Sequence, residues 1–140
     1  METITFLTNS VEDTEKFAEE FASTLVGGEV LLLHGDLGAG KTHFVKGLAV
    51  GLCIDECITS PTFTIHNAYH GRLTLNHFDF YRITDSLEAE MLGLTEFFGD
   101  KSGVCALEWS ENIVDVLPTN CIHVTIDKID LDERKITIIK

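Results

Sequence analysis

Basic residues are scarce in this chain. Its 140 residues include 10 lysines and arginines against 23 aspartates and glutamates, so the formal net charge is −13. A surface this acidic repels a phosphate backbone and an anionic lipid surface. Tight binding of nucleic acid or of a membrane by the chain alone is therefore disfavoured, and any contact with nucleic acid is expected through a partner protein.

Paired cysteine motifs are missing as well. The four cysteines are Cys53, Cys57, Cys105 and Cys121. They include no CxxC pair, and no second pair lies at zinc-finger spacing. Cys105 and Cys121 lie in apolar, strand-like runs, where cysteine behaves as a small buried hydrophobe. We expect free thiols in a reducing cytosol. The alternative is a metal site made of Cys53, Cys57, His66 and His70.

Long apolar runs are absent too. No run reaches the roughly 18 residues of a membrane span. The opening residues METITFLTNSVEDTE lack a basic segment followed by an apolar one, which disfavours a signal peptide. Internal repeats and linkers are not found, and the length fits a single domain over residues 1–140. These features favour one soluble, cytoplasmic domain with its own hydrophobic core.

Hydrophobic periodicity indicates alternating strands and helices. Strands are expected over residues 2–7, 29–34, 63–69, 73–81, 104–107, 121–126 and 134–139. Helices are expected over 11–25, 42–52, 85–92 and 111–116, with one more turn at 95–98. Ser10, with Asp13 three residues later, is expected to cap the first helix. This order predicts a three-layer α/β fold, in which helices flank a mixed sheet with an inserted antiparallel hairpin.

Residues 35–42 read GDLGAGKT and match the pattern GxxxxGK[ST] between an apolar strand and a helix. Gly38 and Gly40 allow the backbone to wrap phosphates with its N–H groups inward, and the next helix adds its positive dipole end. The Lys41 ammonium would lie beside the β- and γ-phosphates, and the Thr42 hydroxyl would bind Mg²⁺. The motif predicts an ATP and magnesium site.

Two acids are candidates for the chemistry, because phosphoryl transfer needs an acid near the metal and a group that orients the attacking atom. Glu108 follows the apolar run VCAL, the expected place for a metal-side acid at the carboxyl edge of a sheet. The alternative for Glu108 is a solvated charge at the end of a strand, with no catalytic role. Asp79 lies late in the second hairpin strand, and its alternative is a surface ion pair with Arg82.

Three further features bear on the nucleotide. Thr62, in the connector SPTFT, would sense the γ-phosphate or belong to an ordinary polar turn. Trp109 would stack near the nucleotide or pack in the core. A guanine signature [NT]KxD is missing; the near match at residues 127–130 lies between the last two strands and is expected in a hairpin loop. Adenine is therefore preferred.

The motifs GDLGAGKT, SPTFT, HFDFYR and LEW occur in this order, and together the chain resembles the TsaE (YjeE) family of P-loop ATPases. The resemblance spans nearly the whole chain. It implies slow, Mg²⁺-dependent ATP hydrolysis in tRNA threonylcarbamoyladenosine synthesis. It implies partners of the TsaD and TsaB type, a threonylcarbamoyl transferase and its inactive paralogue, with tRNA reached only through that complex. The modified adenosine lies next to the anticodon in tRNAs reading codons that begin with A.

Positions that match the family motifs complete the candidate site. The candidate catalytic residues are Lys41, Asp79 and Glu108, and the candidate metal ligands are Thr42 and Glu108. The candidate nucleotide contacts are Asn9, Val11, Gly38, Ala39, Gly40, Lys41, Thr42, His43, Thr62, Trp109 and Arg134. The resemblance further implies that ATP hydrolysis resets the complex between turnovers.

Two other functions remain open at this stage. A small-molecule kinase would need an arginine-rich lid to clamp phosphates. The sequence offers three arginines, namely Arg72, Arg82 and Arg134. The other candidate is a nucleotide-gated scaffold in which hydrolysis is incidental.

Overall fold

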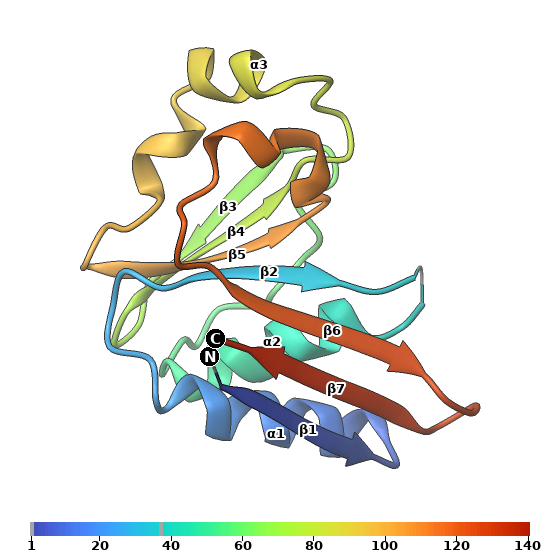
Figure 1. The fold of residues 1–140 in the computed structure, drawn as a ribbon. Helices are drawn as coiled ribbons and strands as arrows, with labels where there is room; N and C mark the ends of the chain where they lie inside the picture. The colour runs from blue at the N-terminus through green and yellow to red at the C-terminus, as the bar shows by residue number, and fades with distance from the viewer. Residues whose placement is uncertain (1, 37) are drawn as a thin grey trace.

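A single sheet runs through the computed structural model, which describes residues 2–36 and 38–140 (Figure 1). Within these residues the strands are β1 (Thr3–Thr8), β2 (Val30–His34), β3 (His66–Tyr69), β4 (Thr74–Asp79), β5 (Gly103–Glu108), β6 (Ile122–Lys128) and β7 (Arg134–Ile139). The helices are α1 (Val11–Ala22), α2 (Lys41–Gly51) and α3 (Ser86–Met91), with 3₁₀ helices η1 (Leu94–Phe97) and η2 (Ser110–Val116). In the described part of the chain no helix is both long and apolar enough to cross a membrane.

The sheet is mixed and has the strand order β1-β7-β6-β2-β5-β4-β3. Its centre is parallel, because β2 pairs in parallel with β5 and β6, and β5 pairs in parallel with β4. Antiparallel strands lie on both sides, with β3 at one edge and β7 and β1 at the other. The predicted α/β fold with a mixed sheet is confirmed. The hairpin is less separate than predicted, since its second strand, β4, belongs to the parallel centre.

The start of α1 follows its predicted cap, but its end does not lie where predicted. The Ser10 hydroxyl accepts from the Asp13 N–H at 3.0 Å. The helix ends at Ala22 rather than at residue 25, because two hydroxyls turn back onto its last carbonyl groups. Ser23 donates to the Glu20 carbonyl at 2.6 Å, and Thr24 donates to the Phe21 carbonyl at 2.7 Å. Such local side-chain hydrogen bonds compete with helix propagation.

Strand β3 begins at His66 rather than at residue 63. The Ile65 N–H donates to the Pro61 carbonyl at 2.6 Å, and Ile65 has a φ of 68°, so residues 61–65 form a turn. Strand β4 ends at Asp79, before the predicted end at residue 81. There the Tyr81 N–H binds the Asp79 carboxylate instead of a neighbouring strand. Both differences lie beside the cleft described below.

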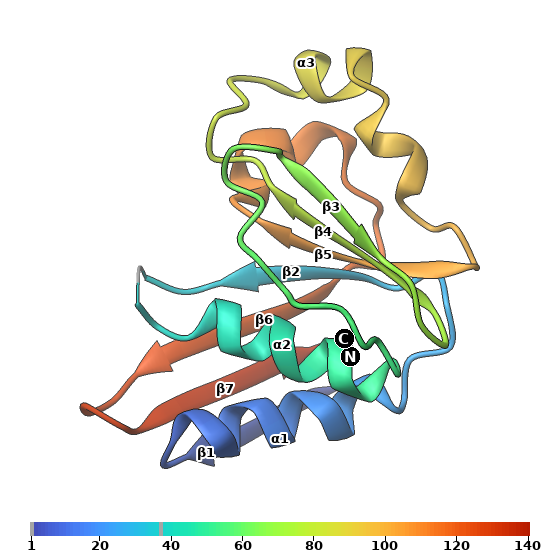
Figure 2. The same cartoon turned by 180° about the vertical axis from the view of Figure 1, so that it is seen from behind.

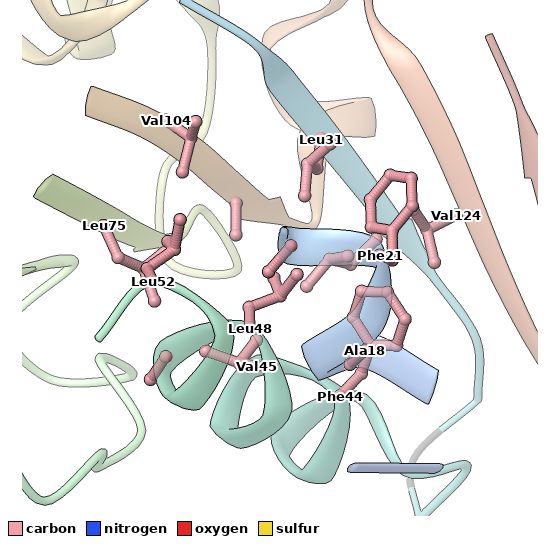
Figure 3. Packing of buried hydrophobic residues seen from close by; sticks show 14 of the residues in the cluster. Ala18, Phe21, Leu31, Phe44, Val45, Leu48, Leu52, Leu75, Val104 and Val124 are labelled. Carbon is pink, nitrogen blue, oxygen red and sulfur yellow. The ribbon is translucent and has the colours of Figure 1, made fainter. Parts of the chain in front are cut away.

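One face of the sheet is covered by α1 and α2 (Figure 2). Side chains alternate along β2, so Leu31 and Leu33 point into the cluster under these helices while Val30 and Leu32 point into the cluster on the opposite face. Figure 3 shows the cluster under the helices, where Phe44 and other large apolar side chains interlock without exposure to solvent. This contact holds α2 against the sheet and so sets the direction of its first turn.

Glycine and alanine let α1 and α2 approach closely. A Cβ at Gly47 would overlap the Glu15 carbonyl oxygen and lie 2.7 Å from the Ala18 Cβ. Gly51 meets Ala22 in the same way one turn later. Atoms at such separations leave no room for a larger side chain. Helix α2 is therefore seated directly on the backbone of α1.

The opposite face is covered only in part. Helices η2, α3 and η1 lie over the half of the sheet that contains β5, β4 and β3 (Figure 1). There Ile113 and Ala89 pack on Phe78 and Leu107, all fully buried. Across β7 and β1 the same face is open, and Leu7, which pairs with Lys135, is 65% exposed. The third layer of the predicted fold is thus present over half of the sheet.

Candidate active site

The glycine-rich loop connects β2 to α2 and takes its shape from two glycines. Gly38 has a φ of 81° and Gly40 a φ of 112°, values that other L-residues rarely adopt. Leu37 falls outside the described residues. Gly40 is the N-cap of α2 and, being glycine, has no side chain that could cap the first turn. The first N–H groups of a helix have no partner within it, so the start of α2 is suited to bind an anion.

A cleft of about 610 Å³ opens in front of this turn. Its lining residues are Gly38, Gly40, Lys41, Thr42, His43, Ser60, Thr62, Asp79, Tyr81, Glu108 and Trp109. They come from the loop, from the connector after α2, and from the carboxyl ends of β4 and β5. Most of the predicted site residues therefore lie around one cavity, although they are distant in the sequence.

Glu108, the last residue of β5, lies beside Lys41, which follows the glycine-rich loop. Its Oε1 lies 3.8 Å from Lys41 Nζ, and its Oε2 lies 2.8 Å from His77 Nε2. The side chain is 12% exposed, so the solvated strand end considered above does not describe it. Because the contact with Lys41 is long, the lysine can move away from Glu108 without breaking a close hydrogen bond.

Asp79 lies directly opposite Glu108 in the parallel register of β4 and β5. It is 6% exposed and accepts two hydrogen bonds, from the Thr62 hydroxyl at 3.1 Å and from the Tyr81 N–H at 2.9 Å. Within residues 2–36 and 38–140 it forms no ion pair with Arg82. That guanidinium lies 5.5 Å from the centre of the Phe63 ring. Neutral donors therefore hold this carboxylate.

The connector after α2 reaches the acids through a pair of hydroxyls. Ser60 Oγ and Thr62 Oγ1 are 2.7 Å apart, and Thr62 donates to Asp79. Both hydroxyls border the cleft. The arrangement is more than the ordinary polar turn considered above, because it links the connector directly to a buried carboxylate.

Trp109 borders the cleft rather than filling the core. It has a φ of 58° and is 42% exposed. Its ring meets the edge of Tyr81 with ring centres 5.0 Å apart, and Lys41 Nζ lies 5.8 Å from its centre. Of the two roles considered for this residue, the structure excludes core packing.

Arg134 reaches the glycine-rich loop from β7. Its Nε donates to the Ala39 carbonyl at 2.8 Å, and its Nη1 donates to the Asp130 carbonyl at 3.0 Å. A small cavity of about 150 Å³ lies beside it. The lining residues are Ser10, Val11, Thr14, Gly38, Gly40, His43, Leu131, Asp132 and Arg134. Arg134 thus braces the loop from outside the main cleft.

The remaining candidates take different places. His43 borders both cavities, and its Nδ1 lies 2.9 Å from Glu15 Oε2 on α1. Ala39 is buried and contributes its carbonyl group to Arg134. Asn9 donates its N–H to Asp13 at 3.1 Å and lies near Val11, but it borders neither of these two cavities. Of the N-terminal candidates, the small cavity includes Val11 alone.

His34 ends β2 beside the loop and forms a pair with His123. The His34 Nε2 and His123 Nδ1 atoms are 3.1 Å apart. Burial lowers the pKa of His34, and the nearby His123 and Lys41 lower it further against the opposing effect of Glu111. The lowered pKa favours the neutral imidazole of His34 at neutral pH.

The donors for a magnesium ion and for the alternative metal site differ in placement. Thr42 and Glu108 both border the cleft and offer a hydroxyl and a carboxylate, the hard oxygen ligands that Mg²⁺ prefers. The Cys/His alternative is not assembled: Cys53 and Cys57 are exposed, and His66 Nε2 lies 2.9 Å from Asn76 Oδ1. Among the described residues no three His, Cys, Asp or Glu side chains are grouped around a metal position.

Sequence reasoning missed Ser60, Tyr81 and His77. Ser60 and Tyr81 border the cleft, and the buried His77 side chain contacts the Glu108 carboxylate. His77 and Tyr81 belong to the HFDFYR motif, and His77 lies two residues before Asp79. Strand periodicity puts residues two apart on one face, so this spacing was a usable indication for His77.

The comparisons with known proteins agree on one family. The family model described as "Threonylcarbamoyl adenosine biosynthesis protein TsaE" matches residues 8–136. The protein named tRNA threonylcarbamoyladenosine biosynthesis protein TsaE from Treponema pallidum is 41% identical over 133 residues, 94% of this chain and 97% of that protein. Its namesake from Bacillus subtilis is 44% identical over 138 residues, 98% of this chain and 85% of that protein.

A solved structure agrees with the sequence relatives. The crystal structure of YdiB from Bacillus subtilis matches with a TM-score of 0.84 and 39% sequence identity, covering 98% of this chain and 84% of that one. The chain shares its P-loop NTPase fold with that protein. With the family match over residues 8–136, these relationships confirm the resemblance seen in the sequence: the chain belongs to the TsaE family.

Proposed function

We propose that the chain is the ATP-binding subunit of tRNA threonylcarbamoyladenosine biosynthesis and that it hydrolyses ATP slowly with Mg²⁺. The observation that carries the proposal is the cleft in front of α2, where Lys41, Thr42, Asp79 and Glu108 converge on one cavity. A cation, a hydroxyl and two carboxylates beside free helix N–H groups are the parts that phosphoryl transfer uses. The names of the relatives support the tRNA pathway.

Nucleotide binding would begin at the loop. The N–H groups of α2 and the backbone around Gly38 and Gly40 would hold the phosphates, and Lys41 would leave Glu108 to hold the terminal ones. Thr42 and Glu108 would hold Mg²⁺, which when bound neutralises phosphate charge. Trp109, half exposed at the rim, offers a flat surface beside the same cavity.

Asp79 is suited to orient a water molecule. Two neutral donors already fix its carboxylate, and each of its oxygens keeps acceptor capacity toward the cleft. Thr62 connects this acid to the connector, so a movement of the connector on nucleotide binding would be felt at Asp79. Asp79 would therefore act on the attacking water, and Glu108 on the metal side.

The kinase alternative loses support because each arginine already has a partner. Arg72 donates to the Leu25 and Ala22 carbonyl groups at the end of α1, both at 3.0 Å. Arg134 braces the loop, and Arg82 lies over Phe63. A phosphate clamp of several free arginines is not formed by the described residues. We therefore propose water, rather than a small metabolite, as the acceptor.

We further propose that the chain works with a threonylcarbamoyl transferase and its inactive paralogue, of the TsaD and TsaB type. A net charge of −13 makes the chain a poor tRNA ligand by itself and a suitable partner for a basic protein surface. Contact with tRNA would then occur only through the complex.

Two measurements test the proposal. Calorimetry with a nonhydrolysable ATP analogue and Mg²⁺ should give one site per chain, and the corresponding guanine nucleotide should bind more weakly. ATP turnover should be slow for the chain alone and should rise when the partner pair and tRNA are added. Absence of analogue binding would overturn the nucleotide site, and turnover that ignores the partners would overturn the coupling.

A further inference from the structure

His77 is buried beneath the acidic end of the cleft and has an unused nitrogen. The residue is completely buried, and its Nε2 lies 2.8 Å from Glu108 Oε2. Its Nδ1 is the buried side-chain nitrogen or oxygen that lacks a hydrogen-bond partner in the part of the chain described by the structure. A buried polar atom left unpaired is costly, so an apolar residue would serve packing better here.

We propose that His77 is a positioning residue for Glu108, a role that rests on the proposed function and adds a residue to its metal side. The two oxygens of Glu108 have different partners. Oε2 faces His77 at 2.8 Å, and Oε1 faces Lys41 at 3.8 Å. His77 fixes Oε2 in place, whereas Oε1 faces the Lys41 ammonium, which can move away toward bound phosphates.

The contacts assign the position of the proton on the ring. The Glu108 carboxylate accepts, so His77 must donate to it from Nε2. Nδ1 has no hydrogen-bond partner among the described residues, so Nε2 is the ring nitrogen that supplies the contact with Glu108. The ring therefore acts as a donor to Glu108 with one fixed direction.

The surroundings of His77 keep that direction fixed. On β4 its side chain lies on the same face as Leu75 and Asp79, and in the sheet it stands opposite Ala106 of β5. Leu75 and Ala106 are fully buried in the cluster under α1 and α2. When Lys41 turns toward phosphates, His77 keeps the Glu108 carboxylate in place and leaves Oε1 directed at the cleft.

His66 provides a matched control on the neighbouring strand. Its Nε2 also contacts a side-chain oxygen, Asn76 Oδ1, at 2.9 Å. Its ring stacks on Phe78, which belongs to the cluster on the opposite face of the sheet, and His66 does not border the cleft. Loss of His66 therefore removes a histidine hydrogen bond without touching Glu108.

The test compares His77→Leu, His77→Gln and His66→Leu in the full chain. Mg²⁺ affinity is measured by calorimetry in the presence of a nonhydrolysable ATP analogue, and analogue affinity is measured separately without Mg²⁺. Partners that orient metal ligands typically contribute 10- to 100-fold in metal affinity, so we expect His77→Leu to weaken Mg²⁺ binding by roughly that factor. Analogue affinity without Mg²⁺ should stay the same. Because Gln can still donate to Glu108, His77→Gln should restore part of the loss. His66→Leu should change neither the Mg²⁺ affinity nor the analogue affinity.

Nitrogen NMR of the nucleotide-free chain gives an independent readout. The His77 ring should show a protonated Nε2, and an Nε2 without a proton would overturn the proposal. So would unchanged Mg²⁺ affinity in His77→Leu. If that variant does not fold, His77→Asn replaces it, since Asn keeps a polar group but is too short to reach Glu108. Failure of the wild type to bind the analogue would defeat the proposed function instead, and the NMR result would still decide the position of the proton.

Discussion

The carboxyl edge of β4 and β5 and the contact between α1 and α2 are held by opposite kinds of interaction. At the edge, polar groups meet through contacts that can be exchanged, such as Lys41 with Glu108 at 3.8 Å and Thr62 with Asp79 at 3.1 Å. Between the helices, Gly47 leaves no space for even one added carbon atom. Tight packing thus fixes the position of α2, while the contacts within the site remain free to rearrange. Substitutions at the carboxyl edge of β4 and β5 should therefore lower activity, and substitutions between α1 and α2 should lower stability.

The largest effect is expected at the two acids. Glu108→Gln and Asp79→Asn should each lower ATP turnover by about 100- to 1,000-fold, the usual loss when one group that stabilises a transition state is removed. ATP binding should persist in both variants. With the partner proteins present, modification should stop after the first round. A variant that binds ATP, does not hydrolyse it, and still supports repeated rounds would favour the nucleotide-gated scaffold.

The second-largest effect is expected for Lys41→Ala, which should weaken nucleotide binding. A hydrogen bond to a charged group contributes about 1.5–3 kcal/mol, which corresponds to roughly 10- to 150-fold in affinity. The melting temperature should change little, because the contact of Lys41 with Glu108 is long. Lys46→Ala, on the same helix but outside the cleft, is the control for calorimetry. Equal affinity of the two variants would contradict the site assignment.

Gly47→Ala tests the other side of the comparison. The added methyl group must push α2 away from the Glu15 carbonyl, and forced overpacking of this kind costs about 1–3 kcal/mol. Urea unfolding should show this loss in the free energy of unfolding. Val50→Ala, at an exposed position of the same helix, should show almost none. If folded Gly47→Ala protein loses ATP turnover while its free energy of unfolding stays near the wild-type value, the helix contact and the site are not separable in this way.

Thr62→Val should have a smaller effect on activity. It removes a neutral hydrogen bond to Asp79, which contributes about 0.5–1.5 kcal/mol, so turnover should fall by less than roughly tenfold and ATP affinity should not change. Thr64→Val removes a hydroxyl that donates to Asn67 away from the cleft, and turnover should stay at the wild-type rate. Equal turnover in the two variants would mean that Thr62 does not act through Asp79.

The reactivity of the four thiols distinguishes exposed from buried parts of the structure, and this measurement does not depend on activity. Cys53 and Cys57 are exposed, whereas burial raises the pKa of Cys105 to about 12. The thiolate is the reactive form, so an alkylating reagent should modify Cys53 and Cys57 in the native protein and Cys105 only after unfolding. Cys121, expected within a strand, lies half-buried just before β6 and should react at an intermediate rate. Mass spectrometry of the labelled peptides measures the order, and early labelling of Cys105 would contradict it.

Several features were predictable because they depend on neighbours in the sequence. The GDLGAGKT spacing located the loop between β2 and α2, and Ser10 with Asp13 located the start of α1. Predictions failed where a local hydrogen bond replaced the regular one. The hydroxyls of Ser23 and Thr24 end α1 early, and the bond from Ile65 to Pro61 delays β3. Apolar periodicity does not register such competition.

The phosphate-binding loop, the order of strands and helices, and the resemblance to the TsaE family could all be predicted from the amino-acid sequence. Each of these depends on short local patterns and on their order along the chain, which can be read without knowing which segments meet in space. Three relationships became visible in the folded chain alone: Asp79 lies opposite Glu108, His77 contacts Glu108, and Arg134 reaches Ala39, 95 residues away in sequence. The reason is that strand pairing and the close contact of α1 with α2 bring distant segments together, and local pattern contains neither the partner of a strand nor its register.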